Sequence, residues 1–209
     1  MFPRQSIQIQ QNPAQYIIFQ RAWSTLLLAQ MGCKVSVLKE RTVNQNPVVF
    51  PLSLYQKALV QESWPIIENQ ALIFGTGVFY KMFLSKPEMA NMFPDVKGVE
   101  DLDNMLQQQK LSGHPRIIVN TLQDAVASLN DAGLFVSKME YVGSLMVEFA
   151  ISTEQLKNVA SAVDSQVQDL IHGEIHSDEI LQAWRELFSF ICVLMKRGHE
   201  KKLSLNKNK

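Results

Sequence analysis

The chain has 209 residues and no net formal charge at pH 7, and 46% of its residues are hydrophobic. This length suits one domain of about 150 residues plus an extension, with enough apolar side chains for a full core. Balanced charge argues against nucleic acid as a partner, because that binding depends on concentrated lysine and arginine. No run of 18 or more uncharged apolar residues occurs, so we expect no transmembrane span.

The two cysteines, Cys33 and Cys192, are far apart in the chain. Two cysteines can form neither a zinc cluster by themselves nor a disulfide framework. A reducing, intracellular setting is the simpler interpretation, and we expect a cytoplasmic protein.

Residues 1–50 differ in composition from the rest. They contain no acidic residue before Glu40, while an apolar stretch runs from Tyr16 to Met31 and is interrupted by Gln20 and Arg21. Three interpretations stay open: an acid-poor targeting segment, a helix lying on the domain or on a membrane surface, and a poorly ordered tail. Gln45-Asn46-Pro47 then predicts a linker.

From Ser53 onward the pattern is helical almost throughout. Ser53 and Gln56 have the spacing of a capping box, which predicts the start of a helix. A second helix is expected from about Phe74 to Ser85, ending before Pro87, and residues 94–102 resemble a loop.

Four further helices are predicted by apolar residues that recur every three or four positions. The Asn130-Asp131-Ala132-Gly133 segment is expected to end the first of them, Gly173 to cap the third, and Ser177 to cap the last. The four apolar series are Leu111, Ile118, Leu122, Ala125, Val126 and Leu129; Phe135, Met139, Val142 and Met146; Leu156, Val159, Ala160, Val163, Val167 and Leu170; and Ile180, Trp184, Leu187, Phe188, Ile191 and Met195. With no strand pattern of useful length, the sequence predicts an all-α domain of six or more helices.

Four landmarks in residues 53–198 resemble the globin family. The first two are the tryptophan-containing segment Leu59–Trp64 and the stretch from Phe79 to Pro94, in which Pro87 is followed six residues later by Phe93. The other two are Lys110–His114, similar to the segment that carries the distal histidine, and Asp178–Gly198, similar to the closing helix. Each is weak alone, but their order and spacing are specific.

The resemblance implies a globin-like fold of six to eight helices over residues 51–199, preceded by the extension 1–50 and followed by a polar tail, 200–209. It implies haem b as the cofactor and a diatomic gas such as oxygen as the ligand. Phe93 would wedge the haem and His114 would face the sixth position of the iron. The full set of haem-contacting residues that it implies is Phe79, Phe93, His114, Ile118, Val142, Met146, Ile151 and Leu156.

The chain departs from the family at the iron. The position of the histidine that holds haem iron in globins is taken by Met146, and no histidine lies between His114 and His172. Pro115 follows His114 directly, and a proline in a helix interior removes a hydrogen bond and breaks the helix unless the helix begins nearby. His114 and Met146 are therefore the two candidate iron ligands.

Two functions follow from these departures. One is a haem globin with His and Met ligation, which suits redox sensing or ligand binding, because thioether ligation raises the potential of haem iron. The alternative is a globin-fold interaction or signalling module in which Met146 only fills the core. An unrelated helical protein is a third possibility. We find no nucleophile elbow, phosphate loop or Cys/His constellation, so we expect no enzyme, and a homodimer stays open.

Overall fold

The computed structural model describes residues 49–93, 113–148 and 151–207. Within these ranges the chain forms six α-helices and one 3-10 helix, and no strand. The expected all-α fold of six to eight helices is therefore confirmed.

Helix α2, Leu54–Glu68, begins at the predicted capping box. The Ser53 hydroxyl accepts from the backbone N–H of Gln56 at 3.2 Å, and the Gln56 side chain accepts from the backbone N–H of Ser53 at 2.9 Å. These two bonds satisfy donors that a helix start otherwise leaves unpaired. Pro65 lies inside α2 without ending it.

The next elements are α3, Ala71–Ser85, the 3-10 helix η1, Pro87–Met92, and α5, His114–Ala127. Pro115 lies in the first turn of α5, where a proline costs no hydrogen bond because that N–H has no partner in the helix. The helix does begin next to Gly113, so Pro115 does not interrupt it.

Helix α6 spans Ala132–Glu148, α7 spans Thr153–Ile171 and α8 spans Ser177–Lys207. The expectation that Gly133 helps to end the preceding helix is wrong, because α5 already ends at Ala127 and Gly133 lies in the first turn of α6. Gly173 follows α7 with a φ of 94°, the left-handed conformation expected of a glycine after a helix end.

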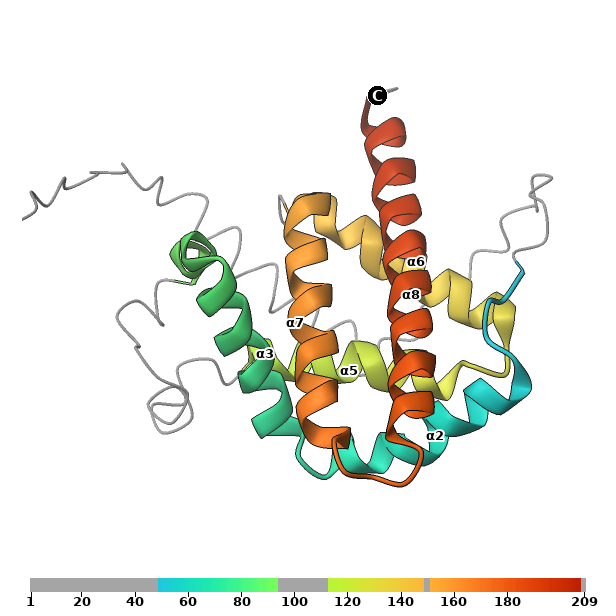
Figure 1. Ribbon diagram of the computed structural model, residues 1–209. Coiled ribbons are helices and arrows are strands. Elements are labelled where there is room, and N and C mark those ends of the chain that lie inside the picture. Colours follow the sequence, from blue (N-terminus) through green and yellow to red (C-terminus); the bar gives the residue numbers. More distant parts are fainter. Residues whose placement is uncertain (1–48, 94–112, 149–150, 208–209) are drawn as a thin grey trace, which may run out of the picture.

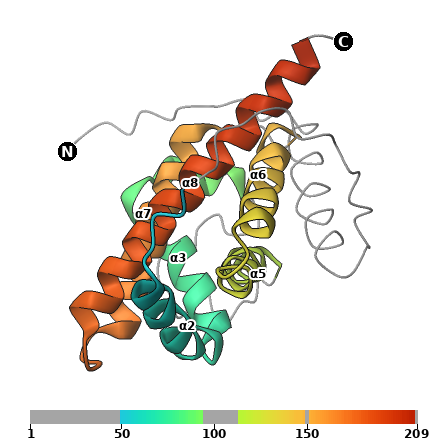
Figure 2. The ribbon, with the colours of Figure 1, turned by 90° about the vertical axis from the view of Figure 1, so that its right-hand side faces the viewer.

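Helices α7 and α8 form an antiparallel pair in the centre of the molecule, joined at the end where α2 lies (Figure 1). Helix α3 packs beside α7, and α6 crosses α8 (Figures 1 and 2). Helices α5 and α6 lie together on one side of the α7–α8 pair (Figure 2). This arrangement leaves α5, α6, α7 and α8 around a shared interior.

The core contains Trp184, Phe74, Phe79 and Phe135, all of which are fully buried. The indole N–H of Trp184 donates to the hydroxyl of Ser63 at 2.9 Å, which ties α8 to α2 through a buried hydrogen bond. A buried N–H without an acceptor is costly, so this bond fixes how the two helices meet.

Both boundaries of the predicted domain can be compared with the described structure. The Phe50 ring packs edge-on against Phe135 with centroids 5.0 Å apart, so the packed body begins by residue 50. Residues 200–207 form the last turns of α8, which project beyond the other helices (Figure 1). The division at residues 50 and 199 stays a prediction, and the rest of the N-terminal extension lies outside the described residues. None of the described helices has the length and apolar character needed to cross a membrane.

Candidate functional site: an apolar cavity between four helices

An apolar cavity of about 140 Å³ lies between α5, α6, α7 and α8. Its wall is hydrocarbon or thioether except for Thr121 and Cys192. The lining residues are Ile117, Ile118, Thr121, Leu122, Val142, Met146, Ile151, Leu156, Val159, Ala160, Val163, Phe188, Ile191, Cys192 and Met195. A wall with no charged side chain suits a ligand that is held mainly by its apolar surface.

Five of the eight predicted cofactor-contacting residues line this cavity together. Ile118 comes from α5, Val142 and Met146 from α6, and Ile151 and Leu156 from the beginning of the α7 region. Met146 is only 3% exposed. The structure thus places the candidate iron ligand Met146 of α6 and the predicted haem-contacting residue Ile118 of α5 in the wall of one cavity.

The other three predicted residues lie elsewhere or are not described. The rings of Phe79 and Phe93 pack edge-on with centroids 5.1 Å apart, and both also pack against Phe83. Neither ring belongs to the cavity wall. Helix α5 begins at His114, but the side chain of His114 lies outside the described residues.

Helix α8 contributes four wall residues that were not expected there: Phe188, Ile191, Cys192 and Met195. Three of them belong to the apolar series of the last predicted helix. Their spacing shows which face of α8 is buried, but it does not show which part of that face borders a cavity rather than a packed neighbour.

The crossing of α6 over α8 determines where Met146 lies. A Cβ added to Gly143 would overlap the backbone carbonyl of Met195, and one added to Gly198 would overlap the carbonyl of Glu140. Backbones approach this closely only where a side chain is missing. Glu140 also pairs with Arg197 and, at 2.8 Å, with Lys201, so the same crossing carries ion pairs. Met146 follows Gly143 by one turn and is positioned by this contact.

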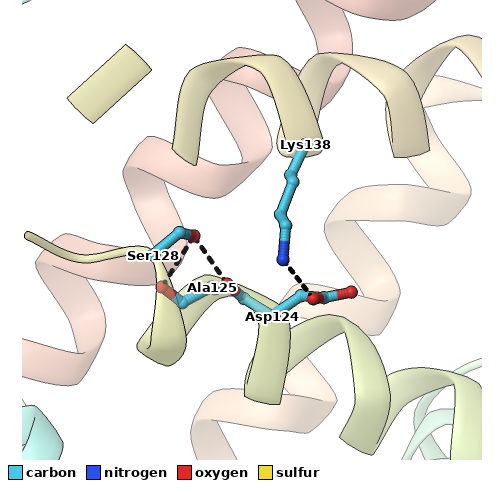
Figure 3. A network of polar contacts seen from close by, with 4 residues as sticks. All are labelled: Asp124, Ala125, Ser128 and Lys138. Atoms are coloured by element: carbon cyan, nitrogen blue, oxygen red, sulfur yellow. Dashed lines mark hydrogen bonds and ion pairs between the residues drawn. The ribbon is translucent and has the colours of Figure 1, made fainter. Parts of the chain in front are cut away.

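A polar contact links α5 to α6 near their connection (Figure 3). The ammonium group of Lys138 on α6 pairs with the carboxylate of Asp124 on α5. In the same region the Ser128 hydroxyl donates to the carbonyls of Asp124 and Ala125, at 2.6 and 3.3 Å, where α5 ends. The two helices are therefore joined at one end, while Ile117 and Met146 border the cavity nearer their other ends.

Cys192 is the cavity-lining residue whose ionisation the environment changes. Burial raises the pKa of the Cys192 thiol above its ordinary value. The thiol is therefore neutral at pH 7 and adds no charge to the wall.

The remaining histidines lie away from the cavity wall. His172 and His176 are exposed at the turn between α7 and α8, and His176 lies 3.6 Å from Glu179. The Nδ1 atom of His199, in the last turns of α8, is buried without a hydrogen-bond partner. Across the described ranges, no three His, Cys, Asp or Glu side chains gather as a metal site.

Comparison with known proteins gives a family match and several relatives. The sequence model of the Globin family matches residues 76–195. Cytoglobin-1 of Oryzias latipes is 22% identical over 151 residues, which cover 72% of this chain and 85% of that protein. A globin of Bursatella leachii is 28% identical over 148 residues, covering 70% of this chain and 98% of that protein.

Solved structures show the same fold. A hexacoordinated haem protein from an anhydrobiotic tardigrade superposes with a TM-score of 0.64 at 15% identity, covering 72% of this chain and 97% of that one. The neuroglobin of the marine acoel Symsagittifera roscoffensis superposes with a TM-score of 0.58 at 19% identity, covering 70% of this chain and 99% of that one. With a family match over more than half of its length, this chain belongs to the globin family.

Proposed function

We propose that this globin binds haem in the cavity between α5 and α6, with the thioether of Met146 as the iron ligand on the α6 side. His114, at the start of α5, is the proposed ligand from the other side. The observation that carries the proposal is that Met146, a nearly buried residue with a sulfur atom able to bind iron, lines an uncharged cavity.

The lining suits the faces of a porphyrin. Ile118 on α5, Val142 on α6 and Leu156 on α7 offer aliphatic contact from three directions. Apolar contact contributes roughly 25 cal/mol for each Å² removed from water, so these residues support haem binding even where the iron bond is weak.

The volume of the cavity sets a condition on this proposal. Pockets that enclose ligands of drug size measure roughly 300–1,000 Å³, and this cavity measures about 140 Å³. Haem binding therefore requires α5 and α6 to separate at the cavity end while the contact between Asp124 and Lys138 holds the other end. Because the α6–α8 crossing at Gly143 holds the cavity end of α6, we expect α5 to be the helix that moves.

When bound, haem supplies gas binding or one-electron redox chemistry, and its ligation by Met and His favours a high potential. The chain contributes a soft neutral ligand and an uncharged, mostly apolar surrounding, which disfavours the more highly charged oxidation state of the iron. We infer a role in redox or gas sensing. One similar structure is described as a hexacoordinated haem protein, which agrees with ligation from both sides.

Because the cavity is smaller than pockets that enclose large ligands, its volume also supports a second candidate function, a globin-fold interaction module without haem. In this case Met146 only fills space in the interior, which methionine does well because it is flexible. Uptake of haem separates the two functions.

The test adds ferric haem to the full-length chain and to its Met146→Leu, Met146→His and His114→Ala variants, and records absorption spectra. Leucine has a similar volume to methionine but no sulfur, so Met146→Leu is the matched control for the iron bond. We expect a Soret band with sharp low-spin visible bands in the wild type. Met146→Leu and His114→Ala should each lose the low-spin bands while still taking up haem, and Met146→His should show a spectrum of ligation by nitrogen alone.

Two outcomes contradict the proposal. Identical spectra for the wild type and Met146→Leu would exclude Met146 as a ligand. No haem uptake by a chain that circular dichroism shows to be folded would support the second candidate.

A further inference from the structure

The last turns of α8 hold α6 at a point before Met146. The carboxylate of Glu140 pairs with two cations of α8, the guanidinium of Arg197 and the ammonium group of Lys201, the latter at 2.8 Å. The side chain of Glu140 is only 17% exposed, so its charge depends on these partners. This contact, called here the inner anchor, adjoins the glycine crossing, because a Cβ on Gly198 would overlap the carbonyl of Glu140.

A second contact, the outer anchor, holds α6 just after Met146. The ammonium group of Lys202 lies 3.0 Å from the carboxylate of Glu148, the last residue of α6. The two side chains are 34% and 46% exposed, so this ion pair is weak and is readily screened by salt. The backbone carbonyl of Met146 accepts from the N–H of Ile151 at 3.0 Å, so the chain that leaves α6 turns back onto the same segment.

Met146 needs such anchors if its sulfur atom is to bind iron, because the methionine side chain is flexible. A metal ligand has to be held close to its binding geometry by the groups around it. Glu140 precedes Met146 by six residues and Glu148 follows it by two. The two anchors therefore fix the helical segment between them, and with it the point from which the thioether enters the cavity.

We propose that the three α8 cations of the two anchors are positioning residues for Met146. This inference rests on the proposed function, in which Met146 binds haem iron. Loss of charge at the partly exposed outer anchor, or high salt, loosens the last turn of α6 and weakens the iron bond of Met146. The last turns of α8 thereby couple charge at the surface to the ligation of the iron.

The test reverses the outer anchor. Lys202→Glu places two carboxylates opposite each other, and Lys202→Glu combined with Glu148→Lys restores an ion pair of opposite polarity. Asp169→Lys is the matched control. It breaks another partly exposed pair between helices, in which Lys81 of α3 lies 2.7 Å from Asp169 of α7, and this pair does not involve α6.

The first measurement needs no haem. The full-length chain is labelled with ¹³C at methionine methyl groups and studied by NMR, and the signal that is lost in Met146→Leu is assigned to Met146. We expect this signal to shift and broaden in Lys202→Glu, to return to its wild-type position in the double variant, and to stay unchanged in Asp169→Lys. Recovery in the double variant shows that the ion pair, and not the lysine itself, positions Met146.

The second measurement is the absorption spectrum after addition of ferric haem. The ratio of low-spin to high-spin haem should fall roughly two- to fivefold in Lys202→Glu, the range that a partly exposed ion pair supports. The double variant should recover the wild-type ratio. Added NaCl should lower the ratio in the wild type, because salt screens the outer anchor.

The proposal is overturned if Lys202→Glu leaves the Met146 signal unchanged or if the double variant does not restore it, whatever the haem spectra show. If Lys202→Glu fails to fold, the neutral variant Lys202→Met takes its place, and an unchanged Met146 signal counts against the anchors in the same way. If the wild type takes up no haem, the proposed function fails, while the methyl signals of the haem-free chain still decide whether the anchors position Met146.

Discussion

At the scale of single residues, Cys192 carries a reactive thiol and lines both the apolar cavity and a groove between α7 and α8. The thiolate, not the thiol, is the nucleophile of cysteine. Because burial raises the pKa of Cys192, the folded protein should keep this residue protonated to higher pH than an ordinary thiol. The group is thereby protected in the folded state.

We predict that alkylation of Cys192 by iodoacetamide is slow at pH 7 and rises only at a pH above the range of a free thiol. Cys33→Ser removes the other cysteine, so the rate reports Cys192 alone. The same protein in urea is the control and should follow the profile of free cysteine. If the folded protein were alkylated at the same pH as the urea sample, or at a lower pH, the prediction would be contradicted.

The same shift has a consequence for stability. A folded-state pKa above the unfolded value means that the folded protein holds its proton more tightly, so the free energy of unfolding falls as pH rises through the range between the two values. Below the ordinary thiol pKa this contribution is fully present. The Cys33→Ser protein should therefore lose stability at alkaline pH by an amount that Cys192→Ala removes.

At the scale of elements, the α6–α8 crossing brings two glycines, Gly143 and Gly198, against the backbone of the opposite helix. A side chain at Gly143 would force the two helices apart. Because α6 also carries Met146, any such movement changes the cavity wall. The glycine is required by the neighbouring backbone and not by its own dihedral angles, which are those of a helix.

We predict that Gly143→Ala lowers the free energy of unfolding by roughly 1–3 kcal/mol, the usual cost of overpacking a well-packed contact. Gly133→Ala is the matched control in the same helix. Its added Cβ would have only the Asp131 carboxylate nearby, at 3.5 Å. Alanine favours helix over glycine by up to about 1 kcal/mol, so Gly133→Ala should be neutral or stabilising. Urea denaturation measures both, and equal effects would contradict the role of the crossing.

At the scale of the whole molecule, haem binding should appear as added stability. A ligand that binds only the folded chain raises its stability by mass action, by about 2.7 kcal/mol at a concentration one hundred times the Kd. The proposed widening between α5 and α6 offsets part of the binding free energy, because the helices must first separate. Thermal unfolding with and without haem measures the net stabilisation, which is the gain from binding less the cost of separating the helices.

We predict that haem raises the Tm of the wild type more than metal-free protoporphyrin does. The two have the same apolar faces, so the difference reports the bond between iron and the protein. In Met146→Leu that difference should shrink, while the shift caused by metal-free protoporphyrin stays the same. A wild-type Tm that rises equally with both compounds would show that contact area alone holds the ligand.

Much of the helical framework follows from interactions between residues three or four apart. The capping box at Ser53 and Gln56 and the helix end at Gly173 were predicted and are confirmed. For Pro115 the sequence left two possibilities open, and the structure shows the one in which the helix begins beside it. These features are local, because a cap or a turn depends on a few neighbouring backbone groups. The error at Gly133 arose because glycine favours a helix end but does not require one.

The position and the lining of the cavity could be found only from the tertiary structure. The sequence alone determined the apolar stripes, because these follow from periodicity along the chain. The assignment of Met146 to the position of the iron ligand rested on the resemblance to the family, and it stays a prediction. It did not show that Cys192 and Met195 border the cavity, or that Phe79 and Phe93 pack together beside Phe83. Those positions depend on how each helix is rotated and where it crosses the next. The crossings are determined by contacts between residues far apart in sequence, such as Gly143 with Met195 and Trp184 with Ser63.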